Sequence, residues 1–141
     1  MGDTGLLISH AFDENGLVKE EIYKKLLLGK LEVNEGMVFE NVVAQMLTAS
    51  GHKLYFYSNS SRENKDERME IDFLIAKKDP TNRHNVSPIE VKSGKRYTYS
   101  SLGKFMNRFN AQLDVPYILH TADYAEKDGI VFIPVYWAWL L

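Results

Sequence analysis

The chain has 141 residues, 45% of them hydrophobic and 26% charged, which is typical of a single globular domain with an adequate core. Its 17 basic and 19 acidic side chains give a formal net charge of −2. This charge excludes a general attraction to nucleic acid and leaves only a local basic patch for such a contact. The absence of cysteine excludes a disulfide scaffold, a thiolate zinc site and cysteine catalysis.

Residues 1–10 lack the basic start and the long apolar core of a signal peptide. No apolar run approaches the roughly 18 residues of a membrane span. We therefore expect a cytoplasmic location without membrane contact. Residues 2–5 lead into the apolar residues 6–8 without a preceding element, so we also expect that the chain is the end of a longer protein.

Two helices are predicted first. Residues 18–28 carry apolar side chains on one side and end before Gly29, a candidate C-cap. Residues 35–49 follow Asn34, a candidate N-cap, and carry apolar residues at helical spacing. That second apolar set consists of Phe39, Val42, Val43, Met46 and Leu47.

Three strands are predicted next. Residues 53–58 alternate around aromatic side chains and predict a first strand, which the polar loop 59–68 follows. The apolar and β-branched runs 69–76 and 86–92 flank a turn-like segment, residues 77–85. Together these three segments predict a strand hairpin.

After a turn at residues 93–96, apolar residues at positions i, i+3, i+4, i+7 and i+11 predict an amphipathic helix. These residues are Leu102, Phe105, Met106, Phe109 and Leu113. Residues 115–120 and 129–135 predict two more strands, and Pro134 favours an edge strand or a strand end. The order helix, helix, three strands, helix, two strands predicts one α/β domain over residues 1–141, a sandwich with a central mixed sheet flanked by helices.

The hairpin of residues 69–92 carries the candidate chemistry. Side chains alternate along a strand, so Glu90 and Lys92 point to the same face, and Asp72 lies in the partner strand. Phosphodiester hydrolysis needs a hard cation that polarises the phosphate and activates water. Mg²⁺ needs only one or two carboxylates because it keeps several waters. Asp72 and Glu90 can supply them, with the carbonyl of Val91 as a third ligand, and Lys92 can hold the water or stabilise developing charge.

Glu40 is the fourth candidate, because it lies at the border of the apolar face of its helix and can point toward the sheet. A simpler alternative for Glu90 and Lys92 is the solvated face of an edge strand. Asp72 lies between apolar neighbours in a strand expected to be central. Since buried acids are scarce unless they are paired or bind a metal, this position favours the functional interpretation.

These residues resemble the PD-(D/E)XK nuclease superfamily: Glu40 in a helix, then Glu70-Ile71-Asp72, then Ile89-Glu90-Val91-Lys92. The resemblance implies a restriction-endonuclease-like fold, with Asp72 and Glu90 as metal ligands, Lys92 as a catalytic residue and Glu40 as the helical acid. Ile71 departs from the pattern, since it stands where the motif has its proline.

A closer resemblance extends over nearly the whole chain. Its motifs are Asp3-Thr4-Gly5-Leu6-Leu7, Gly36-Met37-Val38-Phe39-Glu40-Asn41, Glu70-Ile71-Asp72-Phe73, Pro88-Ile89-Glu90-Val91-Lys92 and Ser101-Leu102-Gly103-Lys104-Phe105. They are similar to an uncharacterised C-terminal domain of prokaryotic AAA-type ATPases. The resemblance implies an ATPase part absent from this chain, and ATP would bind only there, because Ser93-Gly94-Lys95 lacks the first glycine of a phosphate loop.

Four basic residues can form a phosphate-binding rim or an ordinary polar face: Lys95, Arg96, Lys104 and Arg108. Contacts to phosphate would be independent of sequence and sensitive to salt. The four histidines share no metal-ligand spacing, and we expect them to be structural or at the surface. For Trp137 and Trp139 we expect a place in the core, with docking of the ATPase part or a homodimer contact as alternatives.

Three hypotheses follow. The first is a Mg²⁺-dependent phosphodiesterase, with Mn²⁺ as a substitute, that acts on DNA through Asp72, Glu90 and Lys92 while Glu40 orients water. The second is a catalytically idle module of the same fold that binds DNA or docks onto its ATPase. The third is a structural dimerisation domain.

Overall fold

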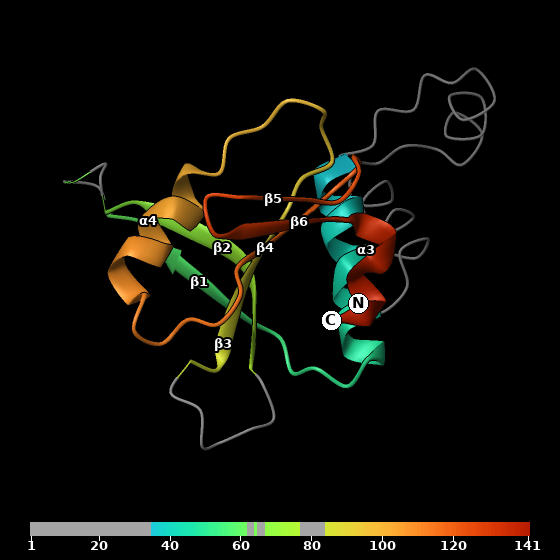
Figure 1. The fold of residues 1–141 in the computed structure, drawn as a ribbon, viewed down its shortest axis with the longest axis horizontal. Helices are drawn as coiled ribbons and strands as arrows, with labels where there is room; N and C mark the ends of the chain where they lie inside the picture. The colour runs from blue at the N-terminus through green and yellow to red at the C-terminus, as the bar shows by residue number, and fades with distance from the viewer. Residues whose placement is uncertain (1–34, 62–63, 65–66, 77–83) are drawn as a thin grey trace, which may run out of the picture.

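The computed structural model describes residues 35–61, 64, 67–76 and 84–141. The predicted helix at residues 18–28 and the motif at residues 3–7 lie outside this range. The described elements, shown in Figure 1, are α3 (Glu35–Ala49), β1 (Tyr55–Asn59), β2 (Met69–Ala76), β3 (Val86–Val91), α4 (Ser100–Phe109), β4 (Tyr117–His120), β5 (Ala125–Lys127), β6 (Ile130–Pro134) and the 3₁₀ helix η1 (Val135–Leu140).

The strands form one six-stranded sheet in the order β1-β2-β3-β4-β6-β5. The first three strands are antiparallel, β3, β4 and β6 run parallel, and β5 returns antiparallel to β6. The helix α4 connects β3 to its parallel neighbour β4, as parallel strands require a crossover connection. The predicted mixed sheet is therefore confirmed.

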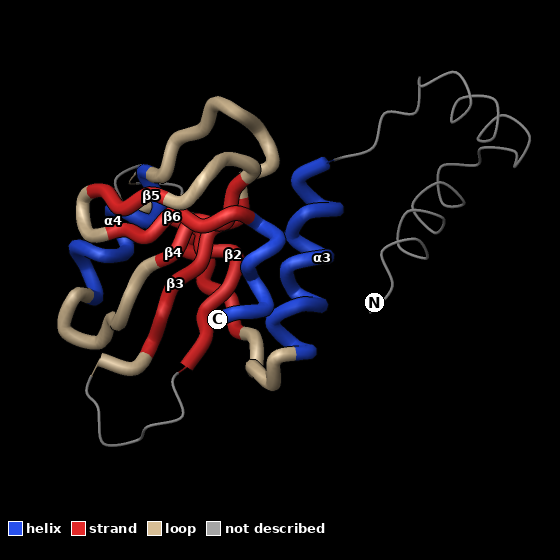
Figure 2. The backbone as a smooth tube through the Cα atoms, turned by 45° about the vertical axis from the view of Figure 1, so that its right-hand side comes forward, coloured by secondary structure: helices blue, strands red, loops and turns tan. Residues whose placement is uncertain are grey.

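Helices cover both faces of the sheet. Figures 1 and 2 show α4 on one side and α3 on the other, where α3 packs against η1. The buried side chains fall into two clusters accordingly. Val43 and Leu47 of α3 pack with residues of β2, β3, β4 and β6 on one face, and Leu102 and Phe105 of α4 pack on the other. This arrangement agrees with the predicted sandwich of a mixed sheet flanked by helices.

A bulge interrupts β2 at its centre. Tyr55 pairs with Leu74 and Tyr57 pairs with Ile71, so β2 uses one residue more than β1 between these pairs. The extra residue changes which side of the sheet the strand presents: Ile71 packs in the α4 cluster, whereas Ile75 packs in the α3 cluster. A bulge re-aims a side chain in this way and is over-represented beside active sites. Here it lies at Asp72 and Phe73.

The structure differs from the sequence analysis at three points, two of them wrong predictions and one a strand that was not predicted. The helix predicted to reach Leu113 ends at Phe109, because Leu113 forms a parallel bridge with Val86 and the Asp114 N–H donates to the Val86 carbonyl. The strand β5 was not predicted. Trp137 and Trp139 are not core residues: they are 39% and 60% exposed, and the buried side chain of η1 is Ala138.

Pro134 is the last residue of β6, an internal strand of the sheet. This position confirms the strand-end alternative and not the edge-strand alternative. Among the described residues, no helix combines the length and the apolarity that crossing a bilayer requires.

Candidate active site

The bulge in β2 turns the Asp72 carboxylate toward β3. The recorded pairing of β2 with β3 runs from Ala76 with Val86 to Phe73 with Ile89. Beyond that pair, Asp72 Oδ2 accepts the backbone N–H of Val91 at 2.7 Å. The Asp72 side chain thus takes the place of a ladder hydrogen bond and is held at the end of β3, where Lys92 follows.

Glu90 points to the α4 side of the sheet, because its neighbours Ile89 and Val91 pack in the α3 cluster. It is only 2% exposed. Lys92 Nζ lies 2.8 Å from Glu90 Oε2, which confirms that these two side chains share a face. Neither Glu90 oxygen has a hydrogen-bond partner of acceptable geometry among the described residues. The Leu102 N–H, in the first turn of α4, is close enough to lower the Glu90 pKa.

Burial raises the pKa values of both carboxyl groups above their ordinary values. For Glu90, burial outweighs the Lys92 ammonium, which lowers the pKa. For Asp72, burial outweighs the Val91 N–H bond and the Lys92 charge, and the negative charge of Glu70 raises the pKa further. Burial removes part of the hydration of both carboxyl groups, which is unfavourable for their charged forms. Neighbouring acids with pKa values shifted by burial are typical of functional sites.

Glu40 joins this group from α3. Although its side chain is largely exposed, desolvation raises its pKa, and the negative charges of Asp72 and Glu70 raise it further. Lys92 lowers it. Asp72 and Lys92 therefore lie within electrostatic reach of both Glu40 and Glu90, which approach them from different elements. Glu70 also belongs to this environment, although the sequence alone did not place it in the central set.

The donor set fits a hard divalent cation. Carboxylate oxygens are the ligands that Mg²⁺ prefers, and Glu90 presents two buried oxygens, of which Oε2 faces the Lys92 ammonium and Oε1 has no hydrogen-bond partner of good geometry among the described residues. Within the described residues, no group of three or more acidic, histidine or cysteine side chains gathers as a metal cluster. The residues that would hold a metal here are the predicted ones, Asp72 and Glu90, with the Val91 carbonyl as the third predicted ligand.

The four predicted basic residues lie on two different segments. Lys95 and Arg96 lie in the bend after β3 and line a cavity. Lys104 and Arg108 lie on α4, where Lys104 Nζ donates to the Arg68 carbonyl at 3.4 Å and the Arg108 guanidinium lies 5.6 Å from the Phe109 ring centroid. Lys104 and Arg108 thus make contacts within the fold.

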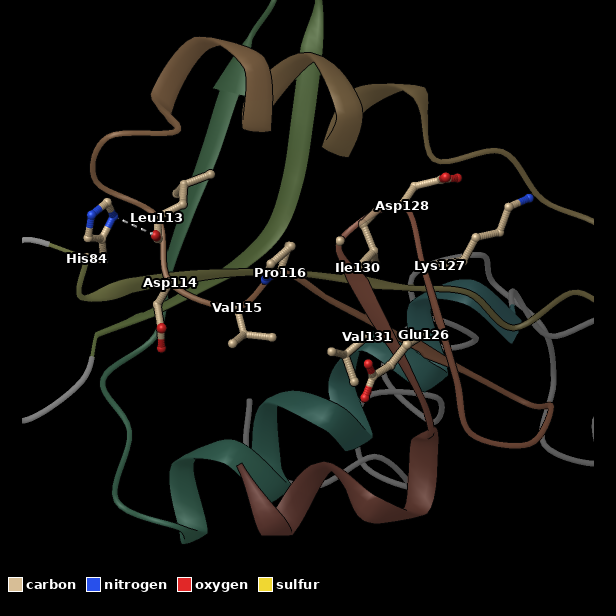
Figure 3. A pocket seen from close by; sticks show the side chains of 11 residues that line it. His84, Leu113, Asp114, Val115, Pro116, Glu126, Lys127, Asp128, Ile130 and Val131 are labelled. Carbon is tan, nitrogen blue, oxygen red and sulfur yellow. Dashed lines mark hydrogen bonds between the residues drawn. The ribbon is translucent and has the colours of Figure 1, made fainter.

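A separate cavity of about 580 Å³ lies at the amino ends of β4 and β6. Figure 3 shows it bordered by the acidic side chains of Asp114, Glu126 and Asp128, with the His84 ring bonded to the Leu113 carbonyl. Glu90 and Lys92 lie at the carboxyl end of β3, whereas this cavity opens at the start of the parallel strands. It is therefore distinct from the candidate site.

Comparison of the sequence with curated proteins and with solved structures finds no match in either group. One family model does match, over residues 35–138, and its description is "Domain of unknown function (DUF4143)". This range contains every predicted site residue and all described strands and helices except the end of η1. Because the match covers most of the chain, the protein belongs to the DUF4143 family.

Proposed function

We propose that this domain hydrolyses phosphodiester bonds in nucleic acid, with DNA as the expected substrate, using a divalent metal ion held by Asp72 and Glu90. The observation that supports this proposal best is the buried Glu90 carboxylate, which lies within reach of the Asp72 charge and has the Lys92 ammonium 2.8 Å from its Oε2 atom. The PD-(D/E)XK resemblance of Glu70–Asp72 and Ile89–Lys92 supports the same chemistry. A bound Mg²⁺ supplies Lewis acidity that polarises a phosphoryl oxygen and activates water.

Each side chain has a role that follows from its position. Asp72 is fixed by the Val91 N–H, so its second oxygen stays free to face a cation. Lys92 is paired with Glu90 at 2.8 Å and would be able to face the substrate if a divalent cation bound Glu90. Its ammonium can then stabilise negative charge that develops on the phosphate. Glu40, largely exposed and coupled to Asp72, can orient water at the rim of the site.

Metal binding is the first test of this proposal. Isothermal titration of the 141-residue chain with Mn²⁺ or Mg²⁺ is compared with Glu90→Gln. The matched control is Glu67→Gln, an exposed acid that does not appear among the charges shifting the pKa values of Glu40, Asp72 or Glu90. We expect saturable binding in the wild type and in the control, with loss of binding in Glu90→Gln. Equal binding by all three proteins contradicts the proposed ligand set.

Cleavage assays then separate chemistry from folding. Asp72→Asn keeps a carbonyl oxygen for the Val91 N–H, whereas Asp72→Ala leaves that N–H unpaired at a cost of about 1–3 kcal/mol. We expect both variants to lose cleavage of DNA, and only the alanine variant to lose stability. Lys92→Met should retain metal binding and lose cleavage. Full cleavage by Asp72→Asn would overturn the mechanism.

A second candidate is a catalytically idle module of the same fold. It is favoured by the Lys92 ammonium that already neutralises Glu90 and by the lack of a three-acid cluster in the described residues. This alternative predicts no binding of Mn²⁺ or Mg²⁺ above background. It also predicts that Glu90→Gln leaves any binding of DNA or of the ATPase part unchanged.

The association with an AAA-type ATPase domain of the same parent chain stays a prediction of the family resemblance. A pull-down of a separately produced ATPase segment with the 141-residue chain tests it. ATP would bind to that segment and not to this domain.

A further inference from the structure

A second cavity, of about 620 Å³, lies between residues 94–97 and residues 120–122. These segments follow the carboxyl ends of β3 and β4, which are parallel neighbours in the sheet. The Lys92 N–H donates to the Leu119 carbonyl at 2.8 Å, so the cavity begins within a few residues of the candidate active site. Ligands of sheets with parallel strands commonly bind outside the carboxyl ends of those strands.

The side chains around this cavity favour an anion. Lys95 and Arg96 supply two positive charges and Thr121 a hydroxyl group, and no acidic residue is among those that line it. The cavity in Figure 3 differs in charge, because three acidic side chains and a single lysine, Lys127, border it. Because Arg and Lys donors match phosphate oxygens well, the lining suits a phosphate group.

The charged groups of Lys95 and Arg96 do not pair with other side chains in the described structure. No hydrogen bond or salt bridge joins the Lys95 or Arg96 side chain to another residue there, in contrast to Lys104 and Lys92. Their charges are therefore available to a ligand.

The wall of the cavity is held by a hydrogen-bonded chain. His120 is only 6% exposed, and its Nε2 lies 3.0 Å from the Asp123 carbonyl. A carbonyl only accepts, so Nε2 carries a proton and donates to it, while Nδ1 lies 2.7 Å from the Tyr97 hydroxyl and forms a second hydrogen bond with it. Tyr97 and His120 are thus positioning residues that fix the segment carrying Lys95 and Arg96.

We propose that this cavity binds a backbone phosphate of a nucleic-acid strand whose reacting phosphate lies at Asp72, Glu90 and Lys92. The path of the strand rests on the proposed function, whereas binding at the cavity does not require cleavage. Contacts of this kind position the strand without reading its sequence. They would supply the local basic patch that a protein of net charge −2 needs for such a ligand.

Fluorescence anisotropy with labelled single-stranded and double-stranded oligonucleotides tests the proposal, in EDTA so that no cleavage occurs. The double variant Lys95→Gln/Arg96→Gln is compared with Lys53→Gln/Lys127→Gln, which removes the same charge from exposed positions outside this cavity. We expect about tenfold or greater weakening in the first variant. We also expect a decrease of about one to two in the salt slope of its affinity. The control should stay within about twofold of the wild type.

A third variant addresses the positioning chain. Tyr97→Phe removes the hydroxyl bonded to His120 while both cations remain, so affinity should decrease with an unchanged salt slope. A change in slope equal to that of the double variant would contradict the positioning role.

Two outcomes overturn the proposal: equal weakening in both double variants, which would reflect net charge alone, and no weakening in either. Titration with inorganic phosphate and ADP distinguishes a free nucleotide from a strand. If only these small ligands depend on Lys95 and Arg96, the nucleic-acid assignment is wrong. Loss of metal binding in Glu90→Gln is measured separately, so failure of the nuclease proposal and failure of this one are distinguishable.

Discussion

Burying the Glu90 side chain costs the folded state solvation free energy. A carboxylate that is 2% exposed loses its hydration, and one ammonium at 2.8 Å does not satisfy all of its lone pairs. Removing both partners of a buried ion pair in favour of apolar residues is often neutral or stabilising. The contribution of the pair to stability therefore does not by itself explain why Glu90 and Lys92 are found here.

The pH dependence of stability tests the state of Glu90. Burial raises its pKa in the folded state, so the folded chain retains this proton to a higher pH than the unfolded chain does. The contribution of this group to stability is greatest below its ordinary value of 4.5 and is lost as the pH rises through the raised pKa. We expect the free energy of unfolding of the wild type, minus that of Glu90→Gln, to decrease between pH 4 and neutral pH in urea titrations.

Mg²⁺ supplies the control for this measurement. A metal ion binds the charged carboxylate, so it should restore stability at pH 8 in the wild type and not in Glu90→Gln. Parallel stability curves for the two proteins, with and without Mg²⁺, would mean that Glu90 is an ordinary ion-pair partner of Lys92.

At the residue scale, the sequence predicted part of this site for a physical reason. Strand alternation places Glu90 and Lys92 on one face, and the structure brings them together. The bond from the Tyr97 hydroxyl to His120 was not predictable in the same way, because it joins a residue between β3 and α4 to the last residue of β4, 23 positions away. No local periodicity reports such a contact.

At the element scale, most boundaries follow from periodicity. Helix α3 and strand β2 begin and end where the sequence predicts, at Glu35–Ala49 and Met69–Ala76. The bulge in β2 has no comparable signal, since it shows only in the register with β1. Strand β5, which was not predicted, did have a signal in the sequence. Asp128-Gly129, with φ values of 55° and 74°, is the dipeptide of a two-residue hairpin turn.

Replacing each of two glycines by alanine should change the stability of the protein in opposite directions. Gly129 has a positive φ in the β5–β6 turn, whereas Gly103 lies inside α4, and a Cβ at either position meets no atom within 4 Å. Gly129→Ala should therefore destabilise the protein by about 1–2 kcal/mol through the left-handed backbone alone. Gly103→Ala should stabilise it by about 0.5–1 kcal/mol through helix propensity. Thermal unfolding of both variants measures these changes, and equal signs would contradict the assigned turn.

At the scale of the whole molecule, one sheet separates two apolar clusters and carries different chemistry at its two ends. The amino ends of β4 and β6 border an acidic cavity, and the carboxyl ends of β3 and β4 border a basic one beside the candidate site. Composition alone could not predict this polarity, because the opposite charges nearly cancel in a net charge of −2. It arises only when the loops after the parallel strands are brought together.

Because both clusters share the same strands, we expect the described domain to unfold as one unit. Leu47 and Leu102 are each 0% exposed, one on either face of the sheet. Replacing either by alanine should cost about 2–5 kcal/mol, whereas Asn107→Ala, at an exposed position of α4, should change stability by less than about 0.5 kcal/mol.

Fluorescence and circular dichroism together test whether the two faces of the sheet unfold in one transition. Both tryptophans lie in η1, on the α3 face, so their fluorescence reports that face, while circular dichroism reports the helices and the sheet together. In urea, Leu102→Ala should shift both transitions to the same lower midpoint, although Leu102 lies on the opposite face. If the fluorescence transition stayed in place while the dichroism transition moved, the α3 face would be stable without the α4 face. The geometry of the candidate active site would then depend on whether α4 is still packed on the sheet.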